Sequence, residues 1–354
     1  MPIQASYFRK KLIKWYLQNK RDLPWRSTKD PYFIWLSEIM LQQTRVAQGL
    51  PYYFKFTKAF PTIHDLANAS EDKILKLWQG LGYYSRARNL HFTAKYISRE
   101  LKGDFPATFH DLLKLKGVGD YTASAIASIC FDKPTAVVDG NVYRVLSRFF
   151  GIDTPINSSK GIKEFKALAQ QLIDKDSPGT FNQAIMEFGA RFCIPQNPNC
   201  SNCIFNDSCV AYSESKVSVL PVKIKKLKVR KRYFNYIVFL SENEQTLLRQ
   251  RTERGIWQKL YEFPLVETTT EVDAIQLKNL QDYQELEAAY NIESLILFNE
   301  DPVIHKLSHQ HLYTRFWIAE VSEITEKSIP VSMVRQYAVP VLIENFIAEF
   351  SEFN

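Results

Sequence analysis

Cysteines with the spacing of a metal site gather in one short segment of the chain. Residues 193–209 read CIPQNPNCSNCIFNDSC and hold four of the five cysteines: Cys193, Cys200, Cys203 and Cys209. Four thiolates on one loop can surround a single compact metal group. Zinc sites with four cysteines usually combine two C-x2-C pairs, whereas here only Cys200 and Cys203 form such a pair. The C-x6-C-x2-C-x5-C pattern therefore favours a [4Fe–4S] cluster over zinc, and either metal over two disulfides.

Two acidic side chains, far apart in the sequence, stand in contexts suited to acid–base chemistry. Glu38 lies in WLSEIMLQQTRV, where Gln42 and Arg45 share its predicted helical face and apolar residues flank it. Partial burial would raise the pKa of Glu38 and keep a proton available. Asp139 lies in VVDGNVYRVLSR, just before a predicted helix. It is expected to cap that helix and is equally a candidate catalytic carboxylate.

A glycine pair marks a candidate phosphate site. In LLKLKGVGDYTASAIA, Gly117 and Gly119 separate two apolar helical segments. Two glycines allow a tight turn whose backbone N–H groups point outward beside a helix N-terminus, an arrangement that binds phosphate without reading sequence. The segment from about residue 111 to 130 is therefore predicted to be a phosphate-binding hairpin between helices.

Composition and charge indicate a folded protein with a substantial hydrophobic core and an acidic partner. The 354 residues are 45% hydrophobic and 14% aromatic, with a formal net charge of +7. These values fit two folded domains and favour nucleic acid as the partner. The N-terminal residues lack the apolar core of a signal peptide, and no stretch approaches a membrane span. A cytoplasmic, nucleoid-associated chain is expected, and reduced thiols there favour metal binding over disulfides.

A change in residue pattern along the sequence predicts two domains. Residues 1–212 contain amphipathic helical runs separated by Gly and Pro, including a helix that Asp30 and Pro31 are expected to begin. Residues 213–232 form a predicted basic linker. Residues 233–354 combine strand-like runs such as YTRFWIAEV with the helical run AIQLKNLQDYQELEAAYN, which predicts a separate α+β domain.

Together these motifs resemble the endonuclease III group of DNA glycosylases, which are helix–hairpin–helix proteins with an iron–sulfur loop. SEIMLQQT is similar to the signature of the adenine glycosylases within that group. The resemblance implies that Glu38 protonates adenine at N7, so that the base leaves as a neutral species. It also implies that Asp139 faces the sugar of the extruded nucleotide and stabilises or traps the cation formed there. Asn141 of the same motif joins the implied catalytic set.

One position departs from part of the group. Bifunctional members carry a lysine just after the hairpin, where this chain has Tyr121. That lysine forms a Schiff base and cleaves the strand, which a phenol cannot do. Tyr121 is expected to hydrogen-bond Asp139 and support the sugar cation. The substitution favours base removal without efficient strand cleavage.

Further segments carry residues that the resemblance implies in DNA binding. Gln183, in FNQAIMEFGA, is expected to read the base through its amide. The segments LPWR, LQQT and GLGYYSRARNL match stretches that enter the duplex and hold the opposite strand. Besides Gly117 and Gly119 of the hairpin, the implied DNA-binding residues in these segments are Arg26, Gln42, Gln43, Thr44, Gly82, Tyr83 and Arg86.

The C-terminal residues resemble the Nudix-like domain of adenine glycosylases. Ala288 and Ala289 stand where a Nudix hydrolase would have metal-binding acids, so binding without hydrolysis is expected. The resemblance implies that Ser308 and His309 contact 8-oxoguanine opposite the adenine. The family often has an aromatic residue where this chain has Leu307.

These inferences predict an all-α helix–hairpin–helix glycosylase domain with a [4Fe–4S] loop, followed by an α+β Nudix-like domain. The predicted protein is a monomeric, monofunctional adenine DNA glycosylase. Its predicted substrate is double-stranded DNA in which adenine is mispaired with 8-oxoguanine or guanine. The alternatives are a bifunctional endonuclease III-like enzyme, a non-catalytic iron–sulfur DNA-binding protein and a Nudix-type nucleotide hydrolase.

Overall fold

The computed structural model describes residues 2–224, 229–324 and 327–353. It divides into two compact units, one of Met1–Ala69 with Asn89–Lys225 and one of Ser70–Arg88 with Lys226–Asn354. Relative to the domains expected from the sequence, residues 70–88 group with the C-terminal part of the chain. Residues 225–228 of the predicted linker lie outside the described residues.

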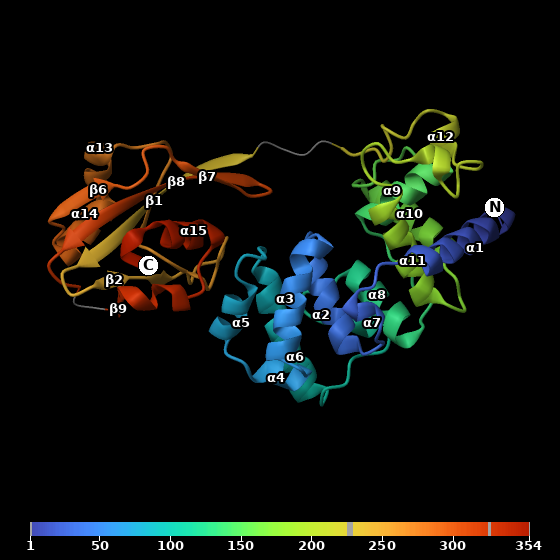
Figure 1. The fold of residues 1–354 in the computed structure, drawn as a ribbon, viewed down its shortest axis with the longest axis horizontal. Helices are drawn as coiled ribbons and strands as arrows, with labels where there is room; N and C mark the ends of the chain where they lie inside the picture. Colours follow the sequence, from blue (N-terminus) through green and yellow to red (C-terminus); the bar gives the residue numbers. More distant parts are fainter. Residues whose placement is uncertain (1, 225–228, 325–326, 354) are drawn as a thin grey trace. The chain divides into compact units, whose positions relative to one another are not determined.

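The first unit is helical, as the sequence predicts (Figure 1). Helix α11 packs against α1, α8 and α9, and α2 packs against α3 and α8. Phe8 of α1 stacks on Phe205 of the cysteine segment at 4.9 Å between ring centroids, so the N-terminal helix helps to hold that segment. The helices are α1 (Pro2–Asn19), η1 (Pro24–Arg26), α2 (Pro31–Leu41), α3 (Val46–Ala59), α4 (Ile63–Asn68), α6 (Ser85–Glu100, from Asn89 onward in this unit), α7 (Phe109–Leu112), α8 (Asp120–Phe131), α9 (Gly140–Phe150), α10 (Ser159–Leu172), α11 (Pro178–Arg191), η2 (Cys200–Asn202) and α12 (Val210–Ser213).

Local sequence signals set the starts of the helices that carry candidate residues. Asp30 caps α2 by accepting a hydrogen bond from the Tyr32 N–H at 2.9 Å, and Pro31 occupies the first helical position, as predicted. Gly119 is the N-cap residue of α8, and Asp139 is that of α9. The predicted hairpin is thus formed by α7 and α8, with Gly117 and Gly119 in the turn between them.

The second unit is built on a mixed sheet with the strand order β5-β1-β8-β6, and β7 also pairs with β8. Strands β1 (Arg230–Ser241) and β8 (Gln310–Val321) run parallel, and β5 (Leu265–Thr268), β6 (Ser294–Leu297) and β7 (Val303–Lys306) are antiparallel to their neighbours. Two small sheets pair β2 (Gln245–Leu247) with β9 (Ser328–Pro330) and β3 (Arg249–Gln250) with β4 (Tyr261–Glu262). The remaining helices of this unit are α5 (Glu71–Trp78), α13 (Ala274–Lys278), α14 (Gln281–Tyr290), η3 (Val331–Gln336), α15 (Val341–Glu349) and η4 (Ser351–Phe353).

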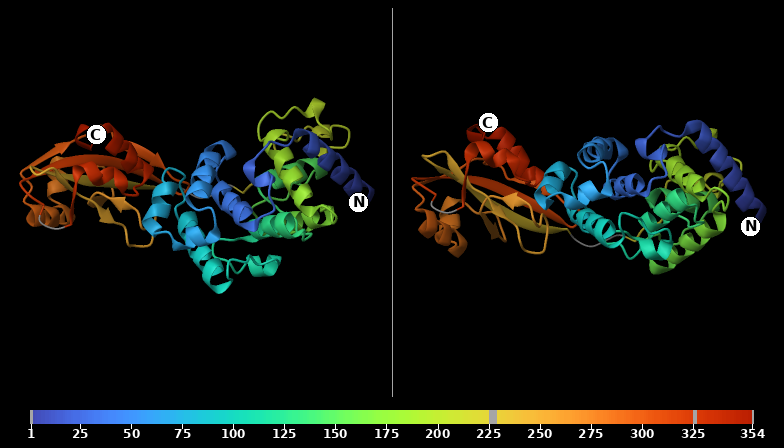
Figure 2. Two further views of the ribbon diagram at one scale, coloured as in Figure 1. Left: turned by 60° about the horizontal axis from the view of Figure 1, so that its bottom comes forward. Right: turned by 90° about the horizontal axis from the view of Figure 1, so that it is seen from below.

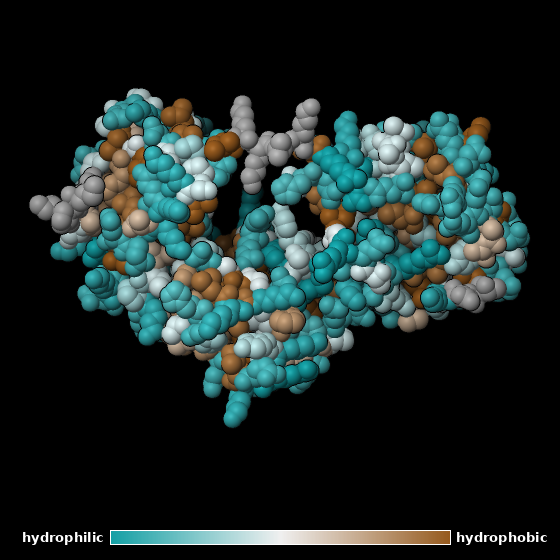
Figure 3. Space-filling view, turned by 180° about the vertical axis from the view of Figure 1, so that it is seen from behind, coloured by the Kyte–Doolittle hydropathy of each residue, from teal (hydrophilic) through white to brown (hydrophobic). Residues whose placement is uncertain are grey.

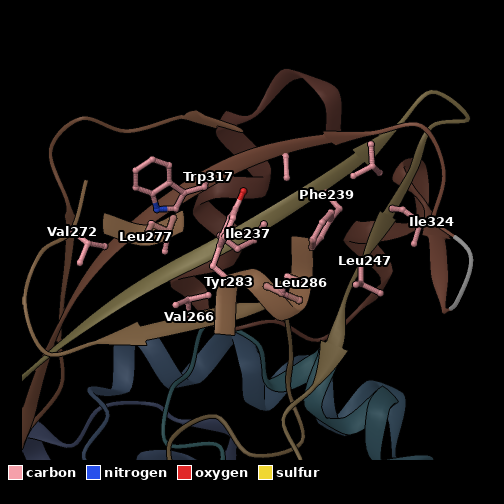
Figure 4. Packing of buried hydrophobic residues seen from close by; sticks show 12 residues of the cluster. Ile237, Phe239, Leu247, Val266, Val272, Leu277, Tyr283, Leu286, Trp317 and Ile324 are labelled. Carbon is pink, nitrogen blue, oxygen red and sulfur yellow. The ribbon is translucent and has the colours of Figure 1, made fainter. Parts of the chain in front are cut away.

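Helices cover parts of both faces of this sheet (Figure 2). On one face, Ile237 and Trp317 of the sheet pack with Leu277 and Tyr283 of α13 and α14 (Figure 4). On the other face, Phe346 of α15 stacks on Phe316 at 4.0 Å. Alternate residues of β1 and β8 therefore face different helices, as the two-residue period of a strand requires.

The structure corrects the single helix expected over residues 274–291. The run forms two helices, α13 and α14, which are separated at Asn279 and Leu280. Leu280 adopts an extended backbone as the N-cap residue of α14, and its side chain packs against the core. The break lets both short helices turn apolar residues toward the sheet.

On the face seen in Figure 3, hydrophilic residues predominate and hydrophobic residues form scattered patches. Among the described helices, none has both the length and the apolar character needed to cross a membrane.

Candidate active site

A cavity of about 170 Å³ lies among the helices of the first unit. Glu38 of α2 and Asp139 at the start of α9 both line it, although about 100 residues separate them in sequence. The wall also contains Tyr121 of α8 and Gln183 of α11. The further lining residues are Arg21, Leu23, Trp25, Arg26, Ile34, Leu41, Thr44, Val46, Ile129, Asn141, Met186, Glu187 and Ala190.

Glu38 is placed to hold a proton at neutral pH. Its side chain is buried, and burial raises its pKa to about 7. The negative charge of Asp139 also raises this pKa, while a hydrogen bond with Tyr121 and the charge of Arg26 act in the opposite direction. The prediction that an apolar setting raises the pKa of Glu38 agrees with this geometry.

Asp139 caps its helix, as predicted, and also lines the cavity, so the cap leaves its candidate catalytic role open as a prediction. Its Oδ1 accepts hydrogen bonds from the backbone N–H groups of Asn141 at 2.9 Å and Val142 at 2.8 Å. Its Oδ2 accepts one from the side-chain amide of Asn141 at 2.7 Å. Burial raises the pKa of Asp139, but these hydrogen bonds and the charge of Arg144 favour the ionised form.

A chain of hydrogen bonds connects this carboxylate to the cysteine segment. Arg144, which is buried, donates to the side-chain oxygen of Asn141 at 2.9 Å and to the carbonyl oxygen of Gly189 at 2.7 Å. Its Nε donates to the carbonyl oxygen of Cys193 at 2.7 Å. The position of Asp139 is therefore tied to the backbone of the first predicted ligand cysteine.

Tyr121 contacts a different carboxylate from the one that the sequence suggested. Its hydroxyl donates to the sulfur of Met186 at 3.0 Å and hydrogen-bonds Glu38, while Asp139 affects it only through its charge. Burial, together with these two carboxylates, raises the pKa of Tyr121 well above its ordinary value. The expected hydrogen bond from Tyr121 to Asp139 is therefore wrong, because the side chain extends from α8 toward α2 and α11.

Gln183 lines the cavity with one end of its amide already engaged. Its oxygen accepts a hydrogen bond from the Tyr16 hydroxyl, which fixes the orientation of the amide. The NH2 group remains the end that can donate to a base. This placement is compatible with the predicted base-reading role.

A buried ion cluster at the cavity wall was missed by sequence reasoning. Glu187 is 1% exposed and accepts hydrogen bonds from Arg21 at 2.6 and 2.8 Å and from Arg26 at 2.7 Å. Burial alone would raise the pKa of Glu187, but the hydrogen bonds from both arginines outweigh it and lower the pKa to about 2. The signal was present, because Glu187 follows Gln183 by one helical turn and so shares its face.

Arg26 lies in this cluster at the cavity wall, and its contact with DNA stays a prediction. Its side chain is only 11% exposed and is bound to Glu187. Of the other residues implied in DNA binding, Thr44 lines the same cavity, and the Gln42 amide donates to the Thr122 hydroxyl at 3.2 Å. Gln43 is exposed and has a positive φ of 56°, two residues after the end of α2.

In the second unit, the segment with Gly82, Tyr83 and Arg86 forms a strained turn. Gly82 and Tyr83 have φ values of 76° and 49°, and Tyr83 is 48% exposed. Arg86 is 7% exposed, lies over the rings of Trp78 and Tyr83, and donates to the carbonyl oxygens of Leu81 and Gly82. The predicted DNA contact by Arg86 is not supported, because the side chain shapes the turn from inside.

The predicted lesion loop lies at the turn between β7 and β8. Ser308 and His309 are exposed, and the turn is closed by a hydrogen bond from the Leu307 N–H to the Gln310 oxygen at 2.8 Å. The Ser308 hydroxyl is 2.9 Å from the hydroxyl of Tyr83, which belongs to the same unit.

The glycine hairpin has the geometry expected of a phosphate-binding turn. Gly117 adopts a φ of 81°, and a Cβ built there would lie 2.8 Å from the side chain of Asn89. A Cβ at Gly119 would meet nothing within 4 Å, so the backbone is open to a ligand at the start of α8. The first glycine is required by the turn and the second leaves room in front of it.

The four clustered cysteines line one small cavity, together with Arg148. Arg148 lies 3.5 Å from the Cys193 sulfur and donates to the carbonyl oxygens of Ile194 and Pro195. Across the part of the chain that the structure describes, no three His, Cys, Asp or Glu side chains come close enough to hold a metal ion. Four thiols around one cavity are the kind of ligand set that an iron–sulfur cluster uses.

The fold and this site define a helix–hairpin–helix protein of base excision repair. The family model "HhH-GPD superfamily base excision DNA repair protein" matches residues 36–173, and the model "NUDIX domain" matches residues 235–349. A solved thermostable thymine-DNA glycosylase is 30% identical with a TM-score of 0.56, covering 60% of this chain and 98% of that protein.

Similar proteins among the curated relatives show which glycosylases of this class the chain resembles. An adenine DNA glycosylase of Buchnera aphidicola subsp. Baizongia pistaciae is 36% identical over 318 residues, covering 88% of this chain and 86% of the relative. The mouse adenine DNA glycosylase is 47% identical over 229 residues, covering 61% of this chain and 44% of that protein. The chain belongs to the adenine DNA glycosylase family.

Proposed function

We propose that this protein is a monofunctional glycosylase that removes adenine from DNA when adenine is mispaired with 8-oxoguanine or guanine. The observation that carries the proposal is the single cavity lined by both Glu38 and Asp139. A nucleotide extruded into that cavity would meet an acid on one wall and a carboxylate on another.

The acid acts first. With a pKa of about 7, Glu38 is protonated in a large fraction of molecules at neutral pH and donates its proton to N7 of adenine. Protonation withdraws electrons from the glycosidic bond, which breaks with both electrons leaving on the base. Gln183 and the ion cluster around Glu187 hold the base in place.

The carboxylate then stabilises the sugar. The ionised Asp139, held by the N–H groups at the start of α9, faces the cation that forms at the anomeric carbon. Water adds to that carbon and gives up a proton to Glu38, which restores the acid. Tyr121 cannot form a Schiff base, so the reaction is expected to end at an abasic site.

The mispair specificity is assigned to the second unit. Ser308 and His309 are exposed at a tight turn and offer hydroxyl and imidazole groups to the oxidised base. Nudix-type hydrolysis is not proposed, since the exposed positions of α14 carry Ala288 and Ala289 where that chemistry needs acids.

The cysteine cavity is proposed to hold a [4Fe–4S] cluster through Cys193, Cys200, Cys203 and Cys209. When bound, the cluster supplies structural cross-linking of this segment. The hydrogen bonds of Arg144 and Asn141 then link the backbone of this segment to Asp139 and so fix the position of that carboxylate. We further propose that the protein acts as a monomer in the cytoplasm, on nucleoid DNA.

The test uses labelled duplexes with one central pair: adenine with 8-oxoguanine, guanine or thymine, and separately a guanine–thymine pair or an oxidised pyrimidine. Single-turnover reactions are split, with half treated with alkali to cleave abasic sites. We expect alkali-dependent cleavage at adenine opposite 8-oxoguanine and guanine only. Cleavage without alkali would show a bifunctional enzyme, and reaction only at thymine or oxidised pyrimidine would overturn the proposal.

A further inference from the structure

The pairing register of the second unit creates an open basic and aromatic surface on one face of its sheet. Because β1 and β8 pair in parallel, Lys231 lies beside His311, and Tyr233 beside Tyr313. On the far side of β8, the antiparallel strand β7 places Lys306 beside His311 and Ile304 beside Tyr313. Residues opposite each other in paired strands share a face. Two rows of side chains therefore cross three strands: Lys231, His311 and Lys306, then Tyr233, Tyr313 and Ile304.

The rows are accessible. Lys231 and Lys306 are exposed, Ile304 is 49% exposed, and the other three residues are partly buried. Helices α13 and α14 pack on the same face only farther along the strands, at Ile237 and Trp317. Figure 1 shows the paired ends of β1, β7 and β8 extending beyond those helices.

The chemistry of the rows is cationic and aromatic. Tyr233 and Tyr313 stack at 5.1 Å between centroids with 23° between ring planes, and the Lys231 ammonium lies 5.5 Å from the centre of the Tyr313 ring. None of the six positions is acidic. The next pair along the strands, Asn235 and Arg315, is tied into the fold: Arg315 donates to the Val272 carbonyl oxygen and approaches Glu271 at 3.5 Å. Arg315 thus closes one end of the surface.

We propose that this surface, the 231/313 platform, binds single-stranded DNA. Unpaired nucleotides need cations for their phosphates and aromatic or apolar side chains for their bases, and an open sheet face supplies both at the spacing of neighbouring strands. The two lysines lie in one row and the rings in the next, so a strand crossing β1, β8 and β7 has its backbone over the first row and its bases over the second. This binding is separate from adenine removal.

The platform also adjoins the proposed lesion loop. Lys306 and His311 are the last paired residues before the turn that carries Ser308 and His309. Unpaired DNA on the platform would therefore emerge beside that loop. An acidic protein segment is the competing occupant, but it would leave the tyrosine pair without a specific role.

The test measures fluorescence anisotropy of a labelled oligothymidine with the full-length protein at several salt concentrations. Oligothymidine contains no adenine, so the catalytic cavity has no substrate to bind. The double variant Lys231→Glu with Lys306→Glu should raise the Kd about tenfold or more. It should also make the slope of log Kd against log salt concentration shallower by about 1.4, because each phosphate that a lysine no longer neutralises accounts for roughly 0.7. Tyr313→Ala should raise the Kd by roughly tenfold while leaving the salt slope unchanged, because base stacking carries no counterion release.

The matched control is Lys278→Glu with Lys327→Glu, which makes the same change of net charge at exposed positions outside the platform. It should leave the Kd within about twofold of the wild-type value, since neither position lies on the proposed path of the strand. Circular dichroism of each variant confirms folding. Equal effects of the two lysine pairs would overturn the proposal, as would binding of polyglutamate at least as tight as binding of oligothymidine. Adenine excision is assayed in parallel, so its absence would count against the proposed function without touching this result.

Discussion

At the scale of single residues, the site is organised by the different environments of three carboxylates. Burial raises the pKa of Glu38 to about 7, and the charge of Arg26 only partly opposes this. Glu187 is also buried, but two arginines lower its pKa to about 2. Asp139 is held by three N–H donors. One cavity thus combines a carboxyl with a raised pKa, a carboxylate with a lowered pKa and a carboxylate held by N–H donors, and such different environments are what the proposed division between acid and base roles requires.

The Glu38→Gln substitution tests the acid. Glutamine keeps the shape but has no proton to donate, so single-turnover excision of adenine should fall by about 10²–10⁴-fold. The wild-type rate should decline as pH rises through about 7, since the protonated form then becomes scarce. Excision is measured across the neutral range, from acid to alkaline pH, on the adenine–8-oxoguanine duplex. A wild-type rate that rises steadily across this range would contradict the assignment.

The same substitution should change stability in a pH-dependent way. The folded-state pKa of Glu38 lies above its ordinary value of 4.5, so the folded form holds the proton more tightly. Below pH 4.5, Glu38 is protonated in both states and does not lower the free energy of unfolding. Between pH 4.5 and about 7 it ionises in the unfolded state first, so the free energy of unfolding declines, by about 3 kcal/mol at most. Glu38→Gln removes this decline. Its unfolding temperature should therefore exceed that of the wild type above pH 7 and converge with it near pH 4.5.

Glu100→Gln, at an exposed position on α6, is the control for the stability measurement. It should unfold in parallel with the wild type at every pH. A constant difference between Glu38→Gln and wild type across the same pH range would show that Glu38 does not ionise differently on folding.

At the scale of elements, two of the proposed functional positions lie at the N-terminal ends of helices. Helix α9 begins at Asp139, and α8 begins at the glycine turn, so both place backbone N–H groups at the proposed functional positions. Helix α11 contributes Gln183, Met186 and Glu187 to the cavity from successive turns. The cavity exists because α2, α8, α9 and α11 pack around it.

The hairpin turn gives a prediction that separates its two glycines. Gly117→Ala places a Cβ at a positive φ and 2.8 Å from Asn89, so it should destabilise the protein by roughly 1–2 kcal/mol and weaken DNA binding. Gly119→Ala meets no protein atom, so the unfolding temperature should stay unchanged while affinity for undamaged duplex falls. Thermal unfolding and anisotropy with a duplex lacking a mispair measure the two effects. If Gly119→Ala bound duplex DNA as tightly as the wild type, the hypothesis that this turn binds a phosphate would be wrong.

At the scale of the whole molecule, sequence reasoning recovered the family, the helical and mixed folds, and the two carboxylates that meet in one cavity. It succeeded there because short motifs carry those features. It could not foresee what tertiary packing decides, as with Arg86, whose segment matched DNA-binding stretches of the family but whose side chain is buried against Trp78. The partner of Tyr121 and the Arg21–Glu187–Arg26 cluster likewise depend on how distant helices meet, which no local spacing specifies.

The presence of a second unit leads to the last prediction, which concerns discrimination between mispairs. If Ser308 and His309 recognise the oxidised base, then Ser308→Ala with His309→Ala should slow excision opposite 8-oxoguanine and leave excision opposite guanine unchanged. Each of the two hydrogen bonds removed is worth roughly 0.5–1.5 kcal/mol, so the rate ratio between the two mispairs should fall by about 5- to 150-fold. The measurement is kcat/KM on both duplexes with the same flanking sequence, and Lys278→Glu serves as a surface control. Equal slowing on both mispairs would instead assign the loop to general DNA binding, because a contact made only to the oxidised base cannot affect a duplex that lacks it.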